Sequence, residues 1–178
     1  MIKFKEKTIT SENIYKGKIL NLRVDEIELP DGRNSVREIV EHSGGVTIIA
    51  ITDDNEILLV KQYRKPAEDV LLEIPAGKLE DGEVPLSCAK RELVEETGYQ
   101  TNEINKLFSF YTSPGYSNEI IHIFIARGLT FIGQNPDNDE FIEVVKIKKQ
   151  EIMELINNGK IKDSKTIIGL LRFLRGDI

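Results

Sequence analysis

Residues 77–98 read GKLEDGEVPLSCAKRELVEETG, and this stretch does more than any other to decide the fold. Pro85 to Thr97 is predicted to form an α-helix, because proline suits a first helical turn and Gly98 suits the left-handed position just past the last turn. One face of this helix is apolar at its i, i+3 and i+7 positions, which are Leu86, Ala89 and Leu93. We therefore expect the helix to pack along that face.

The same helix carries three glutamates whose carboxylates share a face. Glu92, Glu95 and Glu96 stand at i, i+3 and i+4, a spacing at which like charges cost an isolated helix roughly 0.2–0.5 kcal/mol per pair. A hard divalent cation would compensate, since Mg²⁺ binds carboxylate oxygens and completes its shell with water and phosphate. Arg91 stands four residues before Glu95 and can hold that carboxylate in place. These residues alone leave a solvated acidic helix face open as the alternative.

Strand patterns lie on both sides of this helix. Apolar residues alternate from Leu20 to Val24 and resume out of phase at Ile27, which predicts a bulge or bend near Asp25. Residues 30–32, Pro-Asp-Gly, predict a hairpin turn, and the apolar run VTIIAIT predicts a strand buried on both faces. Further strands are predicted at 57–63, 106–111, 119–126 and 142–147, and further helices at 149–157 and 164–174. This order of elements indicates a mixed α/β or α+β sandwich around a sheet.

Composition narrows the class of protein. The 178 residues are 40% hydrophobic and 30% charged, which predicts a globular fold with a real core. The formal charge of −6 argues against sequence-independent binding of nucleic acid. Cys88 is the single cysteine, so an intrachain disulfide is impossible. The first residues lack the apolar core of a signal peptide and every apolar run is too short for a membrane span, so we expect a cytoplasmic protein without a membrane partner.

The stretch quoted above resembles the Nudix box, G-x5-E-x7-R-E-U-x-E-E-x-G-U, in which U is usually aliphatic. The matching positions are Gly77, Glu83, Arg91, Glu92, Leu93, Glu95, Glu96 and Gly98, with Tyr99 at the final U. The resemblance implies an α/β/α sandwich around a mixed sheet. It also implies two or more Mg²⁺ per site, or Mn²⁺ in their place, bound by the three helix glutamates, and a supporting role for Glu83 in the loop or the outer metal shell.

A proline extends the resemblance to the ADP-ribose pyrophosphatase branch of this family. Pro114 lies fifteen residues past Tyr99, and a proline at about this distance is the usual marker of the branch. For the proline by itself, an ordinary turn between two strands is the alternative.

The segments QYR at 62–64 and LEIPAG at 72–77 also resemble this branch. The resemblance implies that Arg64 contacts the phosphates or the terminal ribose of the substrate, and that the backbone carbonyl of Ala76 joins the metal shell. A planar guanidinium is well matched to paired phosphate oxygens, although a plain surface position is the alternative for Arg64. Glu73 is expected to orient Arg64 or to hold a metal-bound water.

The N-terminal region completes the resemblance. Members of this branch exchange N-terminal strands in a homodimer and stack adenine on an aromatic residue there, for which Tyr15 is the match. Arg37 is a candidate substrate contact, with a plain strand position as the alternative for both residues, and Glu119 matches an acid placed near the terminal ribose. We expect an N-terminal β region over residues 1–42, involved in dimerisation, and a Nudix hydrolase domain over 43–178. The expected substrate contacts are Tyr15, Arg37, Arg64, Glu73, Lys78, Ser113, Pro114, Gly115 and Glu119.

One departure concerns the proton acceptor. The branch carries alternating acids in a loop before the last strand, commonly one base and one metal ligand. Here Glu140 falls on the metal-binding acid, whereas Asn138 stands where the base is often found, and an amide cannot accept the proton of water. The base is then Glu140 itself, Asp139 after a shift, or Glu95 from the box. Glu96 completes the expected catalytic set.

The resemblance implies hydrolysis of the diphosphate bond of ADP-ribose to AMP and ribose 5-phosphate, by in-line attack of water. The same chemistry on an ADP-sugar, NADH or a nucleoside triphosphate is one alternative. A non-catalytic sensor that binds ADP-ribose is another, although such proteins tend to lose box carboxylates. An acidic calcium-binding domain is disfavoured, since the spacing of an EF-hand loop is missing from the sequence.

Overall fold

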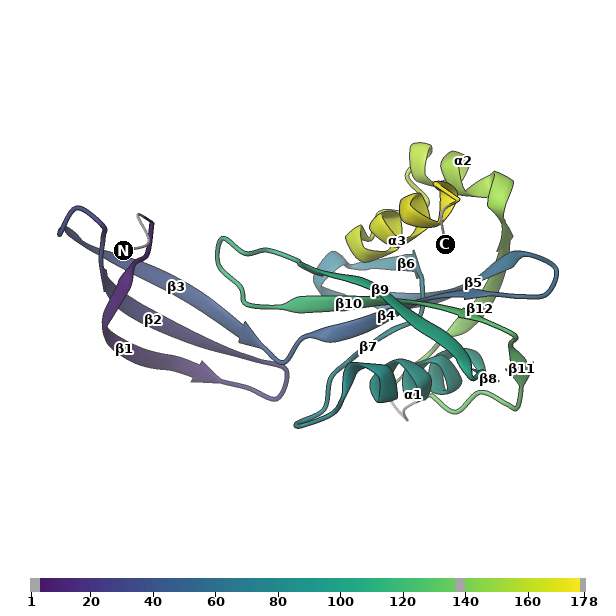
Figure 1. Ribbon diagram of the computed structural model, residues 1–178, viewed down its shortest axis with the longest axis horizontal. Helices are drawn as coiled ribbons and strands as arrows, with labels where there is room; N and C mark the ends of the chain where they lie inside the picture. Colours follow the sequence, from purple (N-terminus) through teal and green to yellow (C-terminus); the bar gives the residue numbers. More distant parts are fainter. Residues whose placement is uncertain (1–3, 137–139, 177–178) are drawn as a thin grey trace. The chain divides into compact units, whose positions relative to one another are not determined.

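The computed structural model describes residues 4–136 and 140–176. The chain divides into two compact units, whose elements are shown in Figure 1, coloured along the sequence. The smaller unit comprises Met1–Gly44 and Phe110–Ile120, and the larger unit comprises Gly45–Ser109 and Ile121–Ile178.

The smaller unit is built on a three-stranded antiparallel sheet. Its strands, in order across the sheet, are β1 (Lys7–Lys16), β2 (Leu20–Glu28) and β3 (Asn34–His42). The predicted turn joins β2 to β3. Gly32 adopts a φ of +85° there, which a side chain would strain, and its N–H donates to the Leu29 carbonyl at 2.9 Å. The predicted hairpin is therefore confirmed.

The bulge predicted near Asp25 is wrong. β2 pairs with β3 in continuous register along its whole length, and the irregularities of this sheet lie in β1, where Ile9 and Ile14 are the extra residues. Asp25 itself is only 3% exposed. Its carboxylate accepts a hydrogen bond from Ser11 Oγ at 2.7 Å and lies 3.4 Å from the Arg23 guanidinium. The break in the alternation thus comes from a buried but paired acid in a regular strand.

The second segment of the smaller unit, residues 110–120, runs beside the end of β3. The Val40 N–H donates to the Tyr116 carbonyl at 2.8 Å, and the Asn118 N–H donates to the Val40 carbonyl at 3.3 Å. The carboxylate of Glu119 lies 3.3 Å from Nδ1 of His42. Backbone and side-chain contacts therefore tie this segment to the sheet.

The larger unit contains a seven-stranded mixed sheet. Five strands follow one another in the order β12-β5-β4-β10-β9, while β6 pairs with β5 and β7 pairs with β4. β10 runs parallel to β4, and the ladders that join β5 to β4, β6 and β12 are antiparallel. The strands of this sheet are β4 (Gly45–Ile51), β5 (Glu56–Arg64), β6 (Asp69–Glu73), β7 (Ala76–Lys78), β9 (Glu103–Tyr111), β10 (Ile120–Arg127) and β12 (Glu143–Lys148). A separate ladder joins β8 (Tyr99–Gln100) and β11 (Thr130–Phe131).

Helices cover both faces of the seven-stranded sheet, with α1 on one side and α2 and α3 on the other (Figure 1). The helices are α1 (Pro85–Thr97), α2 (Ile152–Asn157) and α3 (Ser164–Leu174), and the two 3₁₀ turns are η1 (Lys65–Ala67) and η2 (Lys149–Glu151). Gly98 ends α1 at a φ of +77°, as predicted. No helix within residues 4–136 and 140–176 is long and apolar enough to cross a membrane. The expected α/β/α sandwich around a mixed sheet is confirmed.

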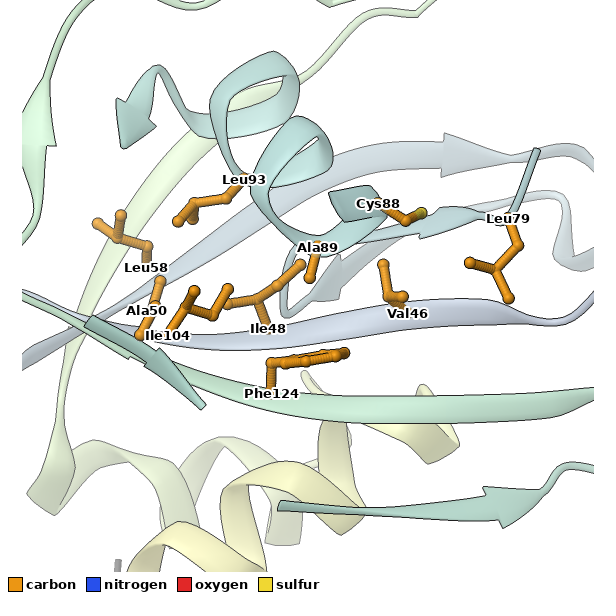
Figure 2. Close-up of a cluster of buried hydrophobic side chains, with 11 residues drawn as sticks. Val46, Ile48, Ala50, Leu58, Leu79, Cys88, Ala89, Leu93, Ile104 and Phe124 are labelled. Atoms are coloured by element: carbon orange, nitrogen blue, oxygen red, sulfur yellow. The ribbon is translucent and has the colours of Figure 1, made fainter. Parts of the chain in front are cut away.

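β4 is buried along its whole length because α1 and α3 cover its two faces. The side chains between β4 and α1, shown in Figure 2, include those of Val46, Ile48, Ala50, Cys88, Ala89 and Leu93. On the other face, α3 approaches so closely that a Cβ on Gly169 would lie 3.5 Å from Cγ1 of Ile49. Leu86, predicted to belong to the packed face of α1, is 41% exposed, so that part of the prediction is wrong.

Candidate active site

Glu96 faces into the larger unit from the last turn of α1, where it is 2% exposed. Its Oε2 accepts a hydrogen bond from the backbone N–H of Ala76 at 2.8 Å, and its Oε1 accepts one from Nε2 of Gln62 at 3.3 Å. These bonds join the helix to β7 and β5. Two of the expected metal ligands, Glu96 and Ala76, are therefore neighbours in the structure.

Arg91 gathers the other glutamates of the box. Its Nη1 donates to Glu92 and to Glu95, both at 2.7 Å, while Nε and Nη2 donate to Glu83 at 3.0 Å. The bonds from Arg91 lower the pKa of Glu83 to about 2, and the carboxylates, Glu83 first, raise the pKa of Arg91. The contact between Arg91 and Glu95 expected from their spacing is present, and the same guanidinium also fastens the loop to the helix.

Two glutamates of the box, Glu92 and Glu96, have raised pKa values. Burial raises the pKa of Glu92 to about 7, with further contributions from the charges of Glu95 and Glu140. Burial also raises the pKa of Glu96 to about 8, helped by the charges of Glu92 and Glu140. Glu140, which precedes β12, therefore lies close enough to α1 for its charge to act on both. A bound cation would relieve this repulsion.

The donor atoms of this cluster fit a hard divalent cation, because carboxylate and backbone carbonyl oxygens are the ligands such cations prefer. Within residues 4–136 and 140–176, no three acidic, His or Cys side chains already converge as a complete set of ligands. Arg91 bridges Glu92 and Glu95, and Glu96 holds the backbone of Ala76. A cation that binds Glu92 and Glu95 would therefore have to displace the hydrogen bonds that Arg91 donates to them.

A second charged group lies at the ends of β5 and β6. Nε and Nη2 of Arg64 donate to the two carboxylate oxygens of Glu73, each at 2.8 Å. Lys165 of α3 also donates to Glu73, whose side chain is only 1% exposed. Burial would raise the pKa of Glu73, but Arg64 and Lys165 outweigh it and lower the pKa to about 2. Glu73 is thus ionised and holds the Arg64 guanidinium in one plane, which is one of the two roles expected for it.

The expected site residues are distributed over the two units. The larger unit contains Arg64, Glu73, Ala76, Lys78, Glu92, Glu95, Glu96 and Glu140. The smaller unit contains Tyr15, Arg37, Ser113, Pro114, Gly115 and Glu119. Every expected metal ligand therefore belongs to the larger unit, while the expected substrate contacts are divided between the two.

In the smaller unit the expected contacts stand on β1, β3 and the segment 110–120. Tyr15 is 58% exposed on β1. Arg37 on β3 donates to both carboxylate oxygens of Glu6, at 3.0 and 2.5 Å. Pro114 lies in a turn that closes on the Ser113 carbonyl, which accepts two backbone N–H bonds at 3.1 and 2.9 Å.

Several residues near the site were not singled out from the sequence. Gln62 is a buried polar residue of β5 between the exposed Lys61 and Tyr63. Its alternation in phase with Leu58 and Val60 is the signal in the sequence that could have found it. Lys165 gave no such signal, because its partner Glu73 lies 92 residues away. Asn138, at the usual position of the base, and Asp139, the alternative after a shift, lie outside the described residues.

Both parts of the chain match known protein families. Residues 41–167 match the NUDIX domain, and residues 6–40 match the nucleoside diphosphate sugar hydrolase N-terminal domain. A protein of Bacillus methanolicus named methanol dehydrogenase activator is 48% identical over 169 residues, which are 94% of this chain and 91% of that protein. The ADP-ribose pyrophosphatase of Bacillus subtilis is 46% identical over 168 residues, covering 93% of this chain and 91% of its own.

A solved structure has the same fold. The crystal structure of an ADP compounds hydrolase superposes with a TM-score of 0.85 at 23% sequence identity, over 97% of this chain and 95% of that one. The domain match spans more than half of the sequence and includes the box whose glutamates, arginine and glycines form the cluster described above. The chain therefore belongs to the Nudix hydrolase family.

Proposed function

We propose that this protein hydrolyses the diphosphate bond of ADP-ribose to AMP and ribose 5-phosphate in the presence of Mg²⁺. The observation that carries the chemistry is the pair of box carboxyls Glu92 and Glu96, whose pKa values are raised by burial first and further by the charge of Glu140. Support for the substrate comes from the similarity, along nearly the whole chain, to the relative from Bacillus subtilis that is named an ADP-ribose pyrophosphatase.

Two or more Mg²⁺ ions, or Mn²⁺, would be held by carboxylates of α1, by Glu140 and by a backbone carbonyl of β7. The proposed ligands are Ala76, Glu92, Glu95, Glu96 and Glu140. When bound, such ions neutralise charge that develops on the phosphate oxygens and help to ionise the attacking water. Because carboxylates line the site, bound cations must offset their negative charge before an anionic substrate can approach.

The residue that accepts the proton of water is proposed to be Glu140. Both oxygens of Glu96 already accept hydrogen bonds, from Ala76 and Gln62. One carboxylate oxygen of Glu95, Oε2, already accepts a hydrogen bond from Arg91 at 2.7 Å. Glu95 is the second candidate for the base, because its side chain is 29% exposed and can contact water when its hydrogen bond from Arg91 is broken.

Arg64 is proposed to bind the substrate's phosphates. Its bidentate pairing with Glu73 uses Nε and Nη2 and leaves the hydrogens of Nη1 directed elsewhere. Its side chain is 38% exposed, so a ligand can reach it. Tyr15, Arg37, Glu73, Lys78, Ser113, Pro114, Gly115 and Glu119 are proposed as further substrate contacts.

A homodimer formed through the smaller unit is also proposed. Ile9, Ile14 and Tyr15 of β1 are 46–58% exposed, and exposed apolar side chains gathered on one strand favour a partner surface. Light scattering at micromolar concentration tests this assembly, and the mass of a single chain would contradict it.

A substrate panel tests the proposed reaction. Purified protein with Mg²⁺ or Mn²⁺ is given ADP-ribose, ADP-glucose, GDP-mannose, NADH and ATP, and the nucleotide products are separated by chromatography. We expect the highest kcat/KM for ADP-ribose, with AMP and ribose 5-phosphate in equal amounts. A higher value for another nucleotide would replace the substrate. Tight binding of ADP-ribose without product in Mg²⁺ would identify a sensor instead of an enzyme.

A further inference from the structure

Four charged side chains form a continuous chain of ion pairs on the α3 side of the larger unit. Arg64 donates twice to Glu73 at 2.8 Å, Lys165 donates to the same carboxylate, and Lys165 Nζ lies 3.0 Å from Asp163. Glu73 is 1% exposed, and Lys165 and Asp163 are each 16% exposed at their side chains. At this depth the charges interact more strongly than surface pairs do.

Hydrogen bonds also order the first turn of α3 and join it to the chain just after β6. Asp163 caps the helix, because its Oδ2 accepts the N–H of Thr166 at 2.9 Å and the hydroxyl of Thr166 at 2.6 Å. The hydroxyl oxygen of Thr166 in turn accepts the backbone N–H of Ile74 at 3.0 Å, directly after Glu73. Lys165 therefore lies in a helical turn that hydrogen bonds hold in place, one residue before Thr166, which binds the backbone of Ile74.

The charge balance depends on Lys165. Arg64, Glu73, Lys165 and Asp163 are neutral as a set of four. Without the lysine, two carboxylates would share one guanidinium, and the remaining set would carry a net charge of −1. The Arg64 guanidinium would then be drawn toward Glu73 and Asp163, whose negative charges would more than offset its own positive charge. Arg64 would therefore attract an anionic ligand less strongly.

We propose that Lys165 is a positioning residue for substrate binding: by sharing Glu73 with Arg64, it leaves the Arg64 guanidinium able to attract a diphosphate. The proposal rests on the proposed function in one respect, the contact of Arg64 with the substrate's phosphates. It assigns Lys165 an effect on affinity for the anion through Glu73, without contact with the substrate.

The test compares Lys165→Met with Lys165→Arg, which keeps the charge. Lys162→Met is the matched control, because it removes the same charge three residues earlier from an exposed pair, Lys162 with Asp69 at 2.9 Å. We measure kcat and KM for ADP-ribose at saturating Mg²⁺, and the Kd of its α,β-methylene analogue by calorimetry. Lys165→Met is expected to raise KM and Kd about tenfold with kcat little changed. Lys165→Arg is expected to restore both, and Lys162→Met to leave both at the wild-type value.

A double-mutant cycle shows whether the effect passes through Arg64. In an Arg64→Ala background, Lys165→Met is expected to add no further increase in Kd, since the residue on which the lysine acts is gone. A full tenfold increase in that background would overturn the proposal, as would a wild-type KM and Kd for Lys165→Met together with a lowered Tm. If Lys165→Met does not fold, Lys165→Gln, which keeps a donor toward Glu73 without the charge, is compared in the same way.

Failure of the substrate assignment has a different signature. If the wild-type protein prefers another nucleotide of the panel, ADP-ribose is wrong as the substrate, and the variants are assayed on the preferred nucleotide. An unchanged KM for Lys165→Met on that nucleotide would then overturn the role of Lys165 separately.

Discussion

A Cβ atom on Gly77 would lie 1.8 Å from Cδ of Glu92, so the backbone of β7 touches this carboxylate directly. Gly77→Ala must therefore displace Glu92 or push β7 away from α1. We expect about a hundredfold loss of kcat/KM and weaker Mg²⁺ binding, because a small displacement of a ligand group is costly in an active site. Steady-state kinetics over a series of Mg²⁺ concentrations measures both.

Gly82→Ala is the matched control for this glycine. An added Cβ there meets no atom within 4 Å, although the φ of +73° makes any side chain strained. This variant is expected to lower Tm and to leave Mg²⁺ affinity unchanged. Equal loss of Mg²⁺ affinity in both variants would mean that the contact between Gly77 and Glu92 is unimportant.

Glu96→Gln separates catalysis from stability. Glutamine keeps an oxygen for the Ala76 N–H but removes a charge proposed to bind metal, so kcat is expected to fall about a hundredfold or more. The pKa of Glu96 is raised to about 8 from 4.5. Its contribution to the stability of the metal-free wild type is therefore present below pH 4.5 and is lost as pH rises through 8. Urea unfolding without metal should show the variant gaining relative stability over that range, and activity equal to wild type at saturating Mg²⁺ would contradict the metal assignment.

Metal affinity should depend on pH. In the metal-free protein the pKa is about 7 for Glu92 and about 8 for Glu96, so each carboxyl must release a proton before it binds a cation at lower pH. Apparent Mg²⁺ affinity is expected to rise from pH 6 to pH 9. Calorimetry at pH 7 in buffers of different ionisation enthalpy should detect proton release. A Mg²⁺ affinity that stays constant across this pH range would show that metal binding does not require these carboxyls to release a proton.

Glu73 should make the protein sensitive to acid in a defined window. Its pKa is lowered from 4.5 to about 2, so its contribution to stability is complete above pH 4.5 and is lost as pH falls through 2. The loss is expected to be on the order of 3 kcal/mol. Glu73→Gln should be less stable than wild type at pH 7, and the difference in the free energy of unfolding should shrink below pH 4.5. A difference that stays constant down to pH 2 would contradict this role of the Arg64 and Lys165 pairs.

Local patterns were enough to predict most of the fold. The helix over 85–97, its glycine cap and the helix over 164–174 all appear where periodicity and end signals put them. The spacing of Glu92, Glu95 and Glu96 pointed to the cluster that the structure buries. Such features depend on residues within one or two turns of each other, so the sequence carries them directly.

Long-range pairing decided the rest. Asp25 broke the alternation of β2 without a bulge, because Ser11 on the neighbouring strand satisfies its carboxylate. Lys165 reaches Glu73 across 92 residues of chain, and no local period encodes a contact of that kind. The sequence by itself determined the secondary structure and the acidic residues of the box. Only the tertiary structure decided which distant charges neutralise one another, because the energy of a buried charge depends on the partners that folding brings beside it.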